Sequence, residues 1–258
     1  MSRLLPLPSL MVAPTGARRT RGDHPALPVT IAQVVDTAAA CHAAGAGGLH
    51  AHVRDSSGQH VLDAGLYAEL MAEMAVQVPT MAVQITTEFA GRYTAAEQRA
   101  LLRMLTPEGV SIALAEMLSD DDLPAARRCY HALAEAGVAV QHILYEPSHV
   151  AWLAREIAAG TVPGQGLTLL FVLGRYTSGQ QSEPEMLAPF LDAMKQARLA
   201  ADWALCAFGR RETACLQAAV TAGGKMRVGF ENNLHMADGT LAPDNTARVR
   251  EVARFLAD

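Results

Sequence analysis

Eight short apolar runs, separated by stretches with helical periodicity, are the feature that most limits the folds open to this chain. The runs are nearly continuous in apolar residues, which is typical of strands buried on both faces of a parallel sheet. They cover residues 9–14, 47–53, 81–87, 109–114, 138–145, 167–173, 203–209 and 225–231. Eight strand–helix units in 258 residues predict an α/β fold, a (β/α)8 TIM barrel that forms one domain over residues 1–258.

The helical stretches have recognisable beginnings and ends. Thr30 is a good N-cap for the first stretch, and Thr94 followed by Glu97 predicts a capping box. The stretches cover residues 30–45, 62–77, 94–105, 121–137, 148–160, 183–197, 211–224 and 243–258. A doubly wound open sheet is the alternative fold. Its usual glycine-rich turn after the first strand is weak here, because "APTGARR" contains one glycine.

Composition excludes several classes of partner. The formal net charge is -5, from 21 basic and 26 acidic residues, and no basic run resembles a nucleic-acid-binding surface. The most basic segment, residues 17–24, is interpreted as a solvated loop. No apolar run reaches the roughly 18 residues of a membrane helix, and prolines interrupt the apolar start. We therefore expect a cytoplasmic protein without membrane or nucleic-acid partners, whose four scattered cysteines are buried thiols.

Two histidines close to the end of the second run predict a metal site. Side chains two apart on a strand share a face, so His50 and His52 can converge on one ion. Glu231 ends the eighth strand, which a closed barrel places beside the first strand and near the second. Three ligands with an open position are typical of catalytic zinc, and other divalent ions suit the same donors. Two histidines hydrogen-bonded inside the barrel are the alternative.

Further polar side chains follow the strands at the same end of the predicted barrel. Arg227 lies four residues before Glu231, where it can bind an anionic substrate or form an ordinary ion pair. The others are Thr86, Thr87, Glu88, Glu116, Glu146 and Arg175. Because catalytic groups of barrels gather at the carboxyl ends of the strands, this concentration predicts a pocket that binds anions and transfers protons.

The segments "GAGGLHAHVRD", "LLFVLGRY", "WALCAFGRRE" and "GGKMRVGFENNL" resemble those of the beta-keto acid cleavage enzymes, the relatives of 3-keto-5-aminohexanoate cleavage enzyme. The resemblance extends from "APTGA" to "DNTARV". It implies a zinc-bearing barrel that is a homo-oligomer, often a homotetramer. It also implies a Claisen-type exchange, in which a β-keto acid and the co-substrate acetyl-CoA give acetoacetate and a new acyl-CoA.

The same resemblance assigns roles to individual residues. It implies that His50, His52 and Glu231 are the metal ligands and that Arg227 is catalytic. Thr86 or Thr87 falls where the family places hydroxyl groups, and Glu146 lies near the family's catalytic glutamate.

Asn232 departs from the family pattern, which has an aspartate after the ligand glutamate. An amide cannot act as a general base, so Glu146, Glu88 or Glu116 is expected to transfer the proton. Asn232 and the threonines would then orient the substrate. Glu116 and Arg175 are candidates to select its side chain, and the chain's modest length predicts trimmed loops around CoA.

Two other functions fit the same pattern of residues. A metal-dependent hydrolase or aldolase would act on a keto acid without CoA, by a metal-activated water. A non-catalytic barrel that binds a metal-chelating metabolite is the second, and Asn232 is the residue that favours it.

Overall fold

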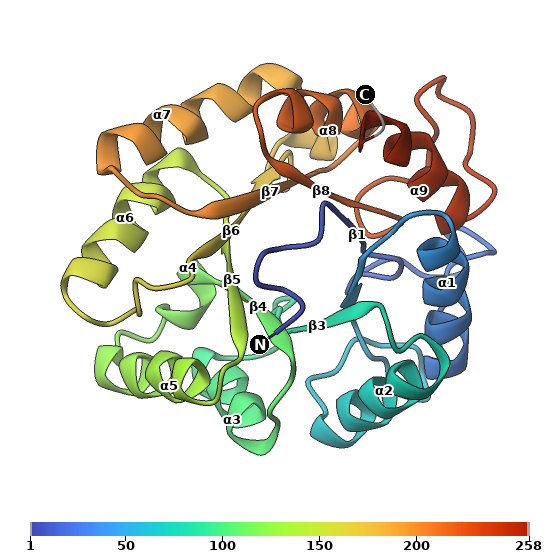
Figure 1. The fold of residues 1–258 in the computed structure, drawn as a ribbon. Coiled ribbons are helices and arrows are strands. Elements are labelled where there is room, and N and C mark those ends of the chain that lie inside the picture. The colour runs from blue at the N-terminus through green and yellow to red at the C-terminus, as the bar shows by residue number, and fades with distance from the viewer. Residues whose placement is uncertain (1, 257–258) are drawn as a thin grey trace.

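The computed structural model describes residues 2–256. These residues form a closed barrel of eight parallel strands with helices around it (Figure 1). Each predicted run contains one strand, and β8 pairs with β1, so the barrel is confirmed and the open sheet is excluded. In barrel order the strands are β1 (Leu10–Val12), β2 (Gly48–Ala51), β3 (Ala82–Thr86), β4 (Gly109–Ala113), β5 (Ala139–Leu144), β6 (Thr168–Leu173), β7 (Asp202–Ala207) and β8 (Lys225–Val228).

Helices surround the barrel, and both predicted capping signals are present (Figure 1). The hydroxyls of Thr30 and Thr94 each accept a hydrogen bond from the backbone N–H of the third helix residue. The side chain of that residue, Gln33 or Glu97, accepts in turn from the backbone N–H of the threonine. The helices are α1 (Ile31–Ala43), α2 (Ala64–Gln77), α3 (Ala95–Met104), α4 (Leu114–Met117), α5 (Leu123–Glu135), α6 (Pro147–Ala158), α7 (Ala188–Ala197), α8 (Glu212–Thr221) and α9 (Asn245–Ala253), with 3-10 turns at Ser178–Gln180, Pro184–Leu187 and Arg254–Leu256. No helix between residues 2 and 256 combines the length and apolarity needed to cross a membrane.

Several predicted runs extend beyond their strands, and the run at 225–231 ends as a strand at Val228, so Glu231 lies in the following loop and not at the strand end. The run at 109–114 ends as a strand one residue early, and the short helix α4 follows it and carries Glu116. The last predicted helix, 243–258, is α9 followed by a 3-10 turn, and its residues 257–258 lie outside the described residues.

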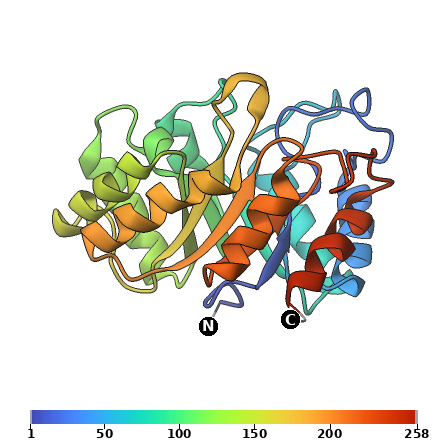
Figure 2. The same ribbon diagram turned by 90° about the horizontal axis from the view of Figure 1, so that it is seen from above.

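Strand β1 joins the two strands that carry the candidate metal ligands. Met11 pairs with Gly48 of β2 on one side and with Arg227 of β8 on the other. All strands are parallel, so their carboxyl ends lie at the same end of the barrel. Figure 2 shows the long loops that follow β1 and β8 gathered at that end. Closure of the barrel therefore brings the end of β2 and the end of β8 to opposite sides of one strand.

Candidate active site

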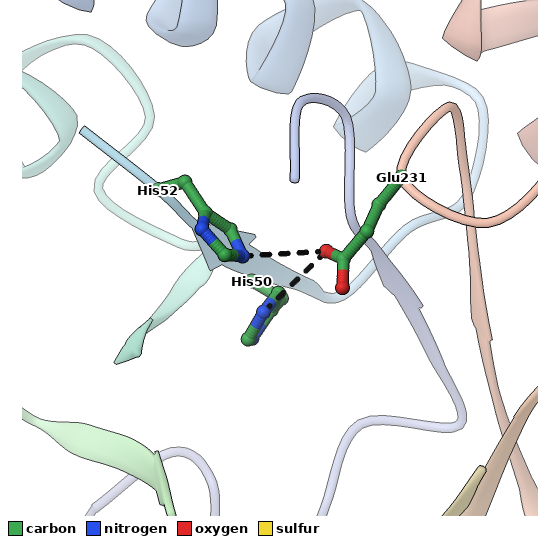
Figure 3. Close-up of side chains that lie close together, drawn as sticks. All are labelled: His50, His52 and Glu231. Atoms are coloured by element: carbon green, nitrogen blue, oxygen red, sulfur yellow. Dashed lines mark ion pairs between the residues drawn. The ribbon is translucent and has the colours of Figure 1, made fainter. Parts of the chain in front are cut away.

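His50 and His52 project from β2 and its extension toward the same point (Figure 3). His50 is the third residue of the strand, and His52 is the first residue after it. Both are buried, and their ring centroids are 5.2 Å apart. The two-residue spacing thus has the effect predicted from strand geometry, because alternate side chains share one face of a strand.

Glu231 reaches the two imidazoles from the loop after β8 (Figure 3). Its Oε2 lies 3.5 Å from His50 Nε2 and 3.5 Å from His52 Nε2. Two donors that bind one zinc ion at about 2.0–2.1 Å in tetrahedral geometry are roughly 3.3–3.4 Å apart. The spacing therefore fits three ligands of one metal ion, and these three residues form the metal-capable cluster among the described residues.

The proton of His50 is fixed on the nitrogen that faces away from Glu231. Gln141 donates to the Leu169 carbonyl and accepts from Gln84 Nε2, which leaves Gln84 Oε1 to face His50 Nδ1 at 2.8 Å. His50 Nδ1–H must then be the donor. Burial, followed by Arg227, lowers the pKa of His50 well below its usual value, so the ring is neutral. Its Nε2 lone pair is directed at Glu231, as metal binding requires.

Glu231 is a carboxylate in a setting that calls for a cation. Burial would raise its pKa, but Arg227, at 3.1 Å from Oε1, and the two histidines hold that pKa well below the usual range. Its Oε2 and the Nε2 of His52 have no hydrogen-bond partner among the described residues. Unpaired buried acceptors that face one another are costly. A divalent ion between them would remove that cost, so the donor set fits a metal.

Gly16 leaves room for Glu231, which yields a testable expectation. Its φ is +66°, and a Cβ placed on it would lie 2.7 Å from Glu231 Cγ. Gly16→Ala should displace the carboxylate and weaken metal affinity by about 10- to 100-fold, measured by competition with a chelator. Gly91→Ala is the matched control, because Gly91 has φ +76° and no heavy atom within 4 Å of a Cβ. Equal affinities in the two variants would contradict this role.

A cavity of about 240 Å³ opens beside the candidate metal ligands. Its wall combines apolar side chains from the strand ends with several charged groups. The charged and polar members are Thr15, Arg18, Arg19, Asp23, His50, Thr86, Glu88, Glu116, Tyr145, Arg175, Gln180, Arg227 and Glu231. Arg227 is buried, and its Nε and Nη1 have no partner among the described residues, so this cation can bind an anionic group.

Two carboxylates in the cavity have different surroundings. Glu88 forms an ion pair with Arg175 at 3.1 Å, and its second oxygen lies 3.8 Å from His52 Nε2. Glu116 accepts a hydrogen bond from the Phe89 backbone N–H at 3.0 Å. Burial raises the pKa of Glu116 to about 7, against the lowering effect of that hydrogen bond. Glu116 is therefore the carboxyl suited to exchange a proton near neutral pH.

Besides His52, three predicted site residues do not line this cavity. Glu146 is exposed at the N-cap of α6, where it accepts from Ser148 Oγ, so the structure does not bring it together with the other candidate residues of the cavity. Thr87 faces the opposite side of its strand from Thr86, with its hydroxyl 3.5 Å from a backbone carbonyl. Asn232 is fully buried, and its side-chain amide has no hydrogen-bond partner among residues 2–256. Neither residue is among those that line the cavity.

Several residues in or beside the cavity were not expected from the sequence. Arg18 and Arg19 belong to the basic segment interpreted as a solvated loop, yet both line the cavity from the loop after β1. Their proximity to β8 depends on barrel closure, so charge density alone could not reveal it. Tyr145 directly follows β5, and its polar strand-end position was the one available signal. His60 contacts His52 from the segment after β2, and no spacing rule singled it out.

Solved structures share this fold. The apo structure of ObcA matches with a TM-score of 0.67 at 16% identity, over 90% of this chain and 62% of that chain. The chain thus spans less than two thirds of the length of ObcA. A type I 3-dehydroquinate dehydratase from Clostridium difficile matches with a TM-score of 0.64 at 8% identity, over 96% and 92% of the two chains. At these identities the likeness concerns the fold alone.

Relatives of known name match over most of their length. A 3-oxoadipate:acetyl-CoA acetyltransferase of Cupriavidus necator is 26% identical, over 95% of this chain and 86% of that protein. A 3-keto-5-aminohexanoate cleavage enzyme of Fusobacterium nucleatum is 24% identical, over 93% and 88%. A 3-dehydrocarnitine:acetyl-CoA trimethylamine transferase of Rhizobium meliloti is 27% identical, over 89% and 84%.

The family assignment rests on the whole barrel. The sequence profile of the beta-keto acid cleavage enzymes matches residues 9–258, from the first strand to the last residue of the chain. This confirms the resemblance seen in the motifs around the second, sixth, seventh and eighth strands. The chain belongs to the beta-keto acid cleavage enzyme family.

Proposed function

We propose that this chain transfers the acyl group of a β-keto acid to CoA in a metal-dependent exchange with acetyl-CoA. A β-keto acid R–CO–CH2–COO⁻ and acetyl-CoA would give acetoacetate and R–CO–CoA, so that carbon, oxygen and sulfur balance. The observation that carries the proposal is the His50–His52–Glu231 cluster beside unpaired Arg227 donors in one cavity. The names of the relatives support the substrate class, because they refer to oxo, keto or dehydro compounds and two of the three name acetyl-CoA.

The ligand residues would hold the ion, for which zinc is the proposed identity. When bound, the ion would supply Lewis-acid stabilisation of the negative charge that develops on the ketone oxygen. Two neutral imidazoles and one carboxylate leave such a site with a net positive charge, which suits an anionic substrate. Thr86, whose hydroxyl already accepts from the Glu88 backbone N–H, borders the same space.

Arg227 would bind the substrate carboxylate through the N–H groups that Glu231 leaves free. Arg227→Met should therefore raise KM and lower kcat/KM by about 10²-fold, since a buried charged partner is lost. The assay is run at saturating zinc, because Arg227 hydrogen-bonds the ligand Glu231 and its loss should also weaken the metal site. Arg227→Lys is the charge-preserving control and should recover part of the activity. Unchanged KM in Arg227→Met would remove Arg227 from substrate binding.

Glu116 would take the proton from the CH2 group between ketone and carboxylate. It borders the cavity, and its raised pKa lets it accept a proton at neutral pH and release it afterwards. Glu88 is less suited, because Arg175 neutralises it. Glu88 and Arg175 would instead contact the side chain of the keto acid, and Arg18 borders the same part of the cavity.

A screen of β-keto acids with acetyl-CoA, read by mass spectrometry of acyl-CoA products, tests the proposal. A new acyl-CoA together with acetoacetate is the expected result. Cleavage of the keto acid without CoA would establish the hydrolase or aldolase alternative. Tight binding of the keto acid without turnover would establish the non-catalytic, metabolite-binding alternative. The homotetramer and the cytoplasmic location stay predictions.

A further inference from the structure

His60 lies behind one of the candidate metal ligands without lining the cavity. Its ring is buried, with Nδ1 3.4 Å from His52 Nδ1 and Nε2 3.1 Å from the Glu88 carbonyl oxygen. The backbone around it is held in place. His60 forms an antiparallel bridge with Arg54, and its carbonyl accepts from Arg92 Nη1 at 3.1 Å. The ring nitrogens therefore face His52 and the Glu88 carbonyl, and the Val53 carbonyl and the Tyr93 ring also lie beside the imidazole.

These contacts determine which nitrogen of each ring carries the proton. A backbone carbonyl can only accept, so His60 Nε2 must be the N–H donor to Glu88. No ion pair among the described residues includes His60, and a charge on its buried ring would be unpaired and costly. A neutral imidazole has one N–H, so His60 Nδ1 carries a lone pair. It accepts from His52, whose proton must then lie on Nδ1.

We propose that His60 is a positioning residue that holds the proton of His52 on Nδ1 and so keeps His52 Nε2 free to bind the metal. The inference rests on the proposed metal site. Gln84 has the corresponding role for His50, because its side-chain carbonyl accepts a hydrogen bond from His50 Nδ1 at 2.8 Å. The two ligands thus reach equivalent states by different partners, an amide for His50 and a neutral imidazole for His52.

Loss of His60 should weaken the site without removing a ligand. In His60→Leu, the Nδ1 of His52 has no fixed partner, and the ring can adopt the tautomer that places a proton on Nε2. We expect zinc affinity to fall by about 10- to 100-fold, which is the usual effect of removing a partner of a metal-binding histidine. His60→Gln should recover much of the loss, because its amide can donate to Glu88 and accept from His52 as His60 does.

The experiment measures zinc affinity by competition with a chromogenic chelator, with folding checked by circular dichroism. The control is His131→Leu, which removes a histidine that contacts the Gly160 carbonyl at 2.9 Å and does not line the cavity. Reduced affinity in His60→Leu, recovery in His60→Gln and no change in the control are expected. Equal affinity in His60→Leu and the unchanged protein would overturn the proposal, as would a loss that His60→Gln leaves uncorrected.

A second measurement needs no variant and no metal. Nitrogen NMR of the histidine rings in the metal-free chain distinguishes Nδ1–H from Nε2–H tautomers. We expect Nε2–H for His60 and Nδ1–H for His52, and the reverse pair would overturn the proposal even if the variants fail to fold. Absence of zinc binding by the unchanged chain would instead count against the proposed metal site, and activity on keto acids enters neither test.

Discussion

Replacing both His50 and His52 by alanine should reduce bound metal from about one ion per chain to none detectable, and abolish the exchange reaction. Two of three protein ligands are lost, and Glu231 alone, paired with Arg227, cannot hold a divalent ion tightly. The metal would supply several kcal/mol of stabilisation to the developing charge, so activity should fall by at least about 10³-fold. Metal analysis by mass spectrometry and the acyl-CoA assay measure the two effects on the same sample.

The control is His42→Ala/His131→Ala, which removes two histidines that do not line the cavity. This control variant should keep both the metal and the activity. The result would show that the effect of the His50/His52 variant comes from the loss of metal ligands and not from the loss of any two imidazoles. The double variant at the site could also fold less stably, so its thermal unfolding should be compared with that of the metal-free unchanged chain. Full activity in the absence of metal would eliminate the proposed mechanism.

Replacement of Glu116 by glutamine should lower kcat by about 10²- to 10⁴-fold, the usual contribution of a general base. In the unchanged chain kcat/KM should rise with pH and level off above about pH 7, because the base works only when deprotonated and its pKa lies near 7. Glu116→Gln should lose this dependence. Initial rates between pH 5 and 9 at saturating and low keto acid separate kcat from KM.

Glu146→Gln is the matched control for this experiment. Glu146 is an exposed carboxylate outside the cavity, so its amide variant should keep the activity and the pH profile. Loss of the profile in Glu146→Gln, with Glu116→Gln unaffected, would restore the role that the sequence predicted for Glu146.

The raised pKa of Glu116 also has a consequence for folding. A buried carboxyl with a raised pKa keeps its proton to higher pH in the folded than in the unfolded chain. The contribution of Glu116 to the free energy of unfolding should therefore fall as pH rises from the unfolded pKa, near 4.5, through about 7. Glu116→Gln should become relatively more stable than the unchanged chain over that range in urea unfolding. A constant difference between the two would show that Glu116 titrates normally.

Much of the architecture could be predicted from the sequence because its signals are local. The continuous apolar runs identify strands buried on two faces, and the capping residues Thr30 and Thr94 identify where helices begin. The grouping of His50, His52 and Glu231 followed from strand period and barrel order, which depend on position in the chain. The opposite orientation of Thr86 and Thr87 follows from the same period.

The direction of a side chain beyond a strand end could not be predicted in this way. Glu116 and Glu146 both follow strands in the sequence, yet a short helix directs Glu116 into the cavity while α6 begins at Glu146 and leaves it in solvent. Loop conformation, and not strand period, determines these positions. The basic segment after β1 is a similar case, since Arg18 faces the cavity only because β1 lies between β2 and β8.

The sequence by itself determined the barrel, its eight strands and the donor set of a metal site, because periodicity, capping and two-residue spacing are properties of neighbouring residues. Only the tertiary structure decided which carboxylate can take a proton and which nitrogen of each histidine is free. Those properties depend on burial and on hydrogen bonds between residues far apart in the chain, such as His50 with Gln84 and His60 with Glu88.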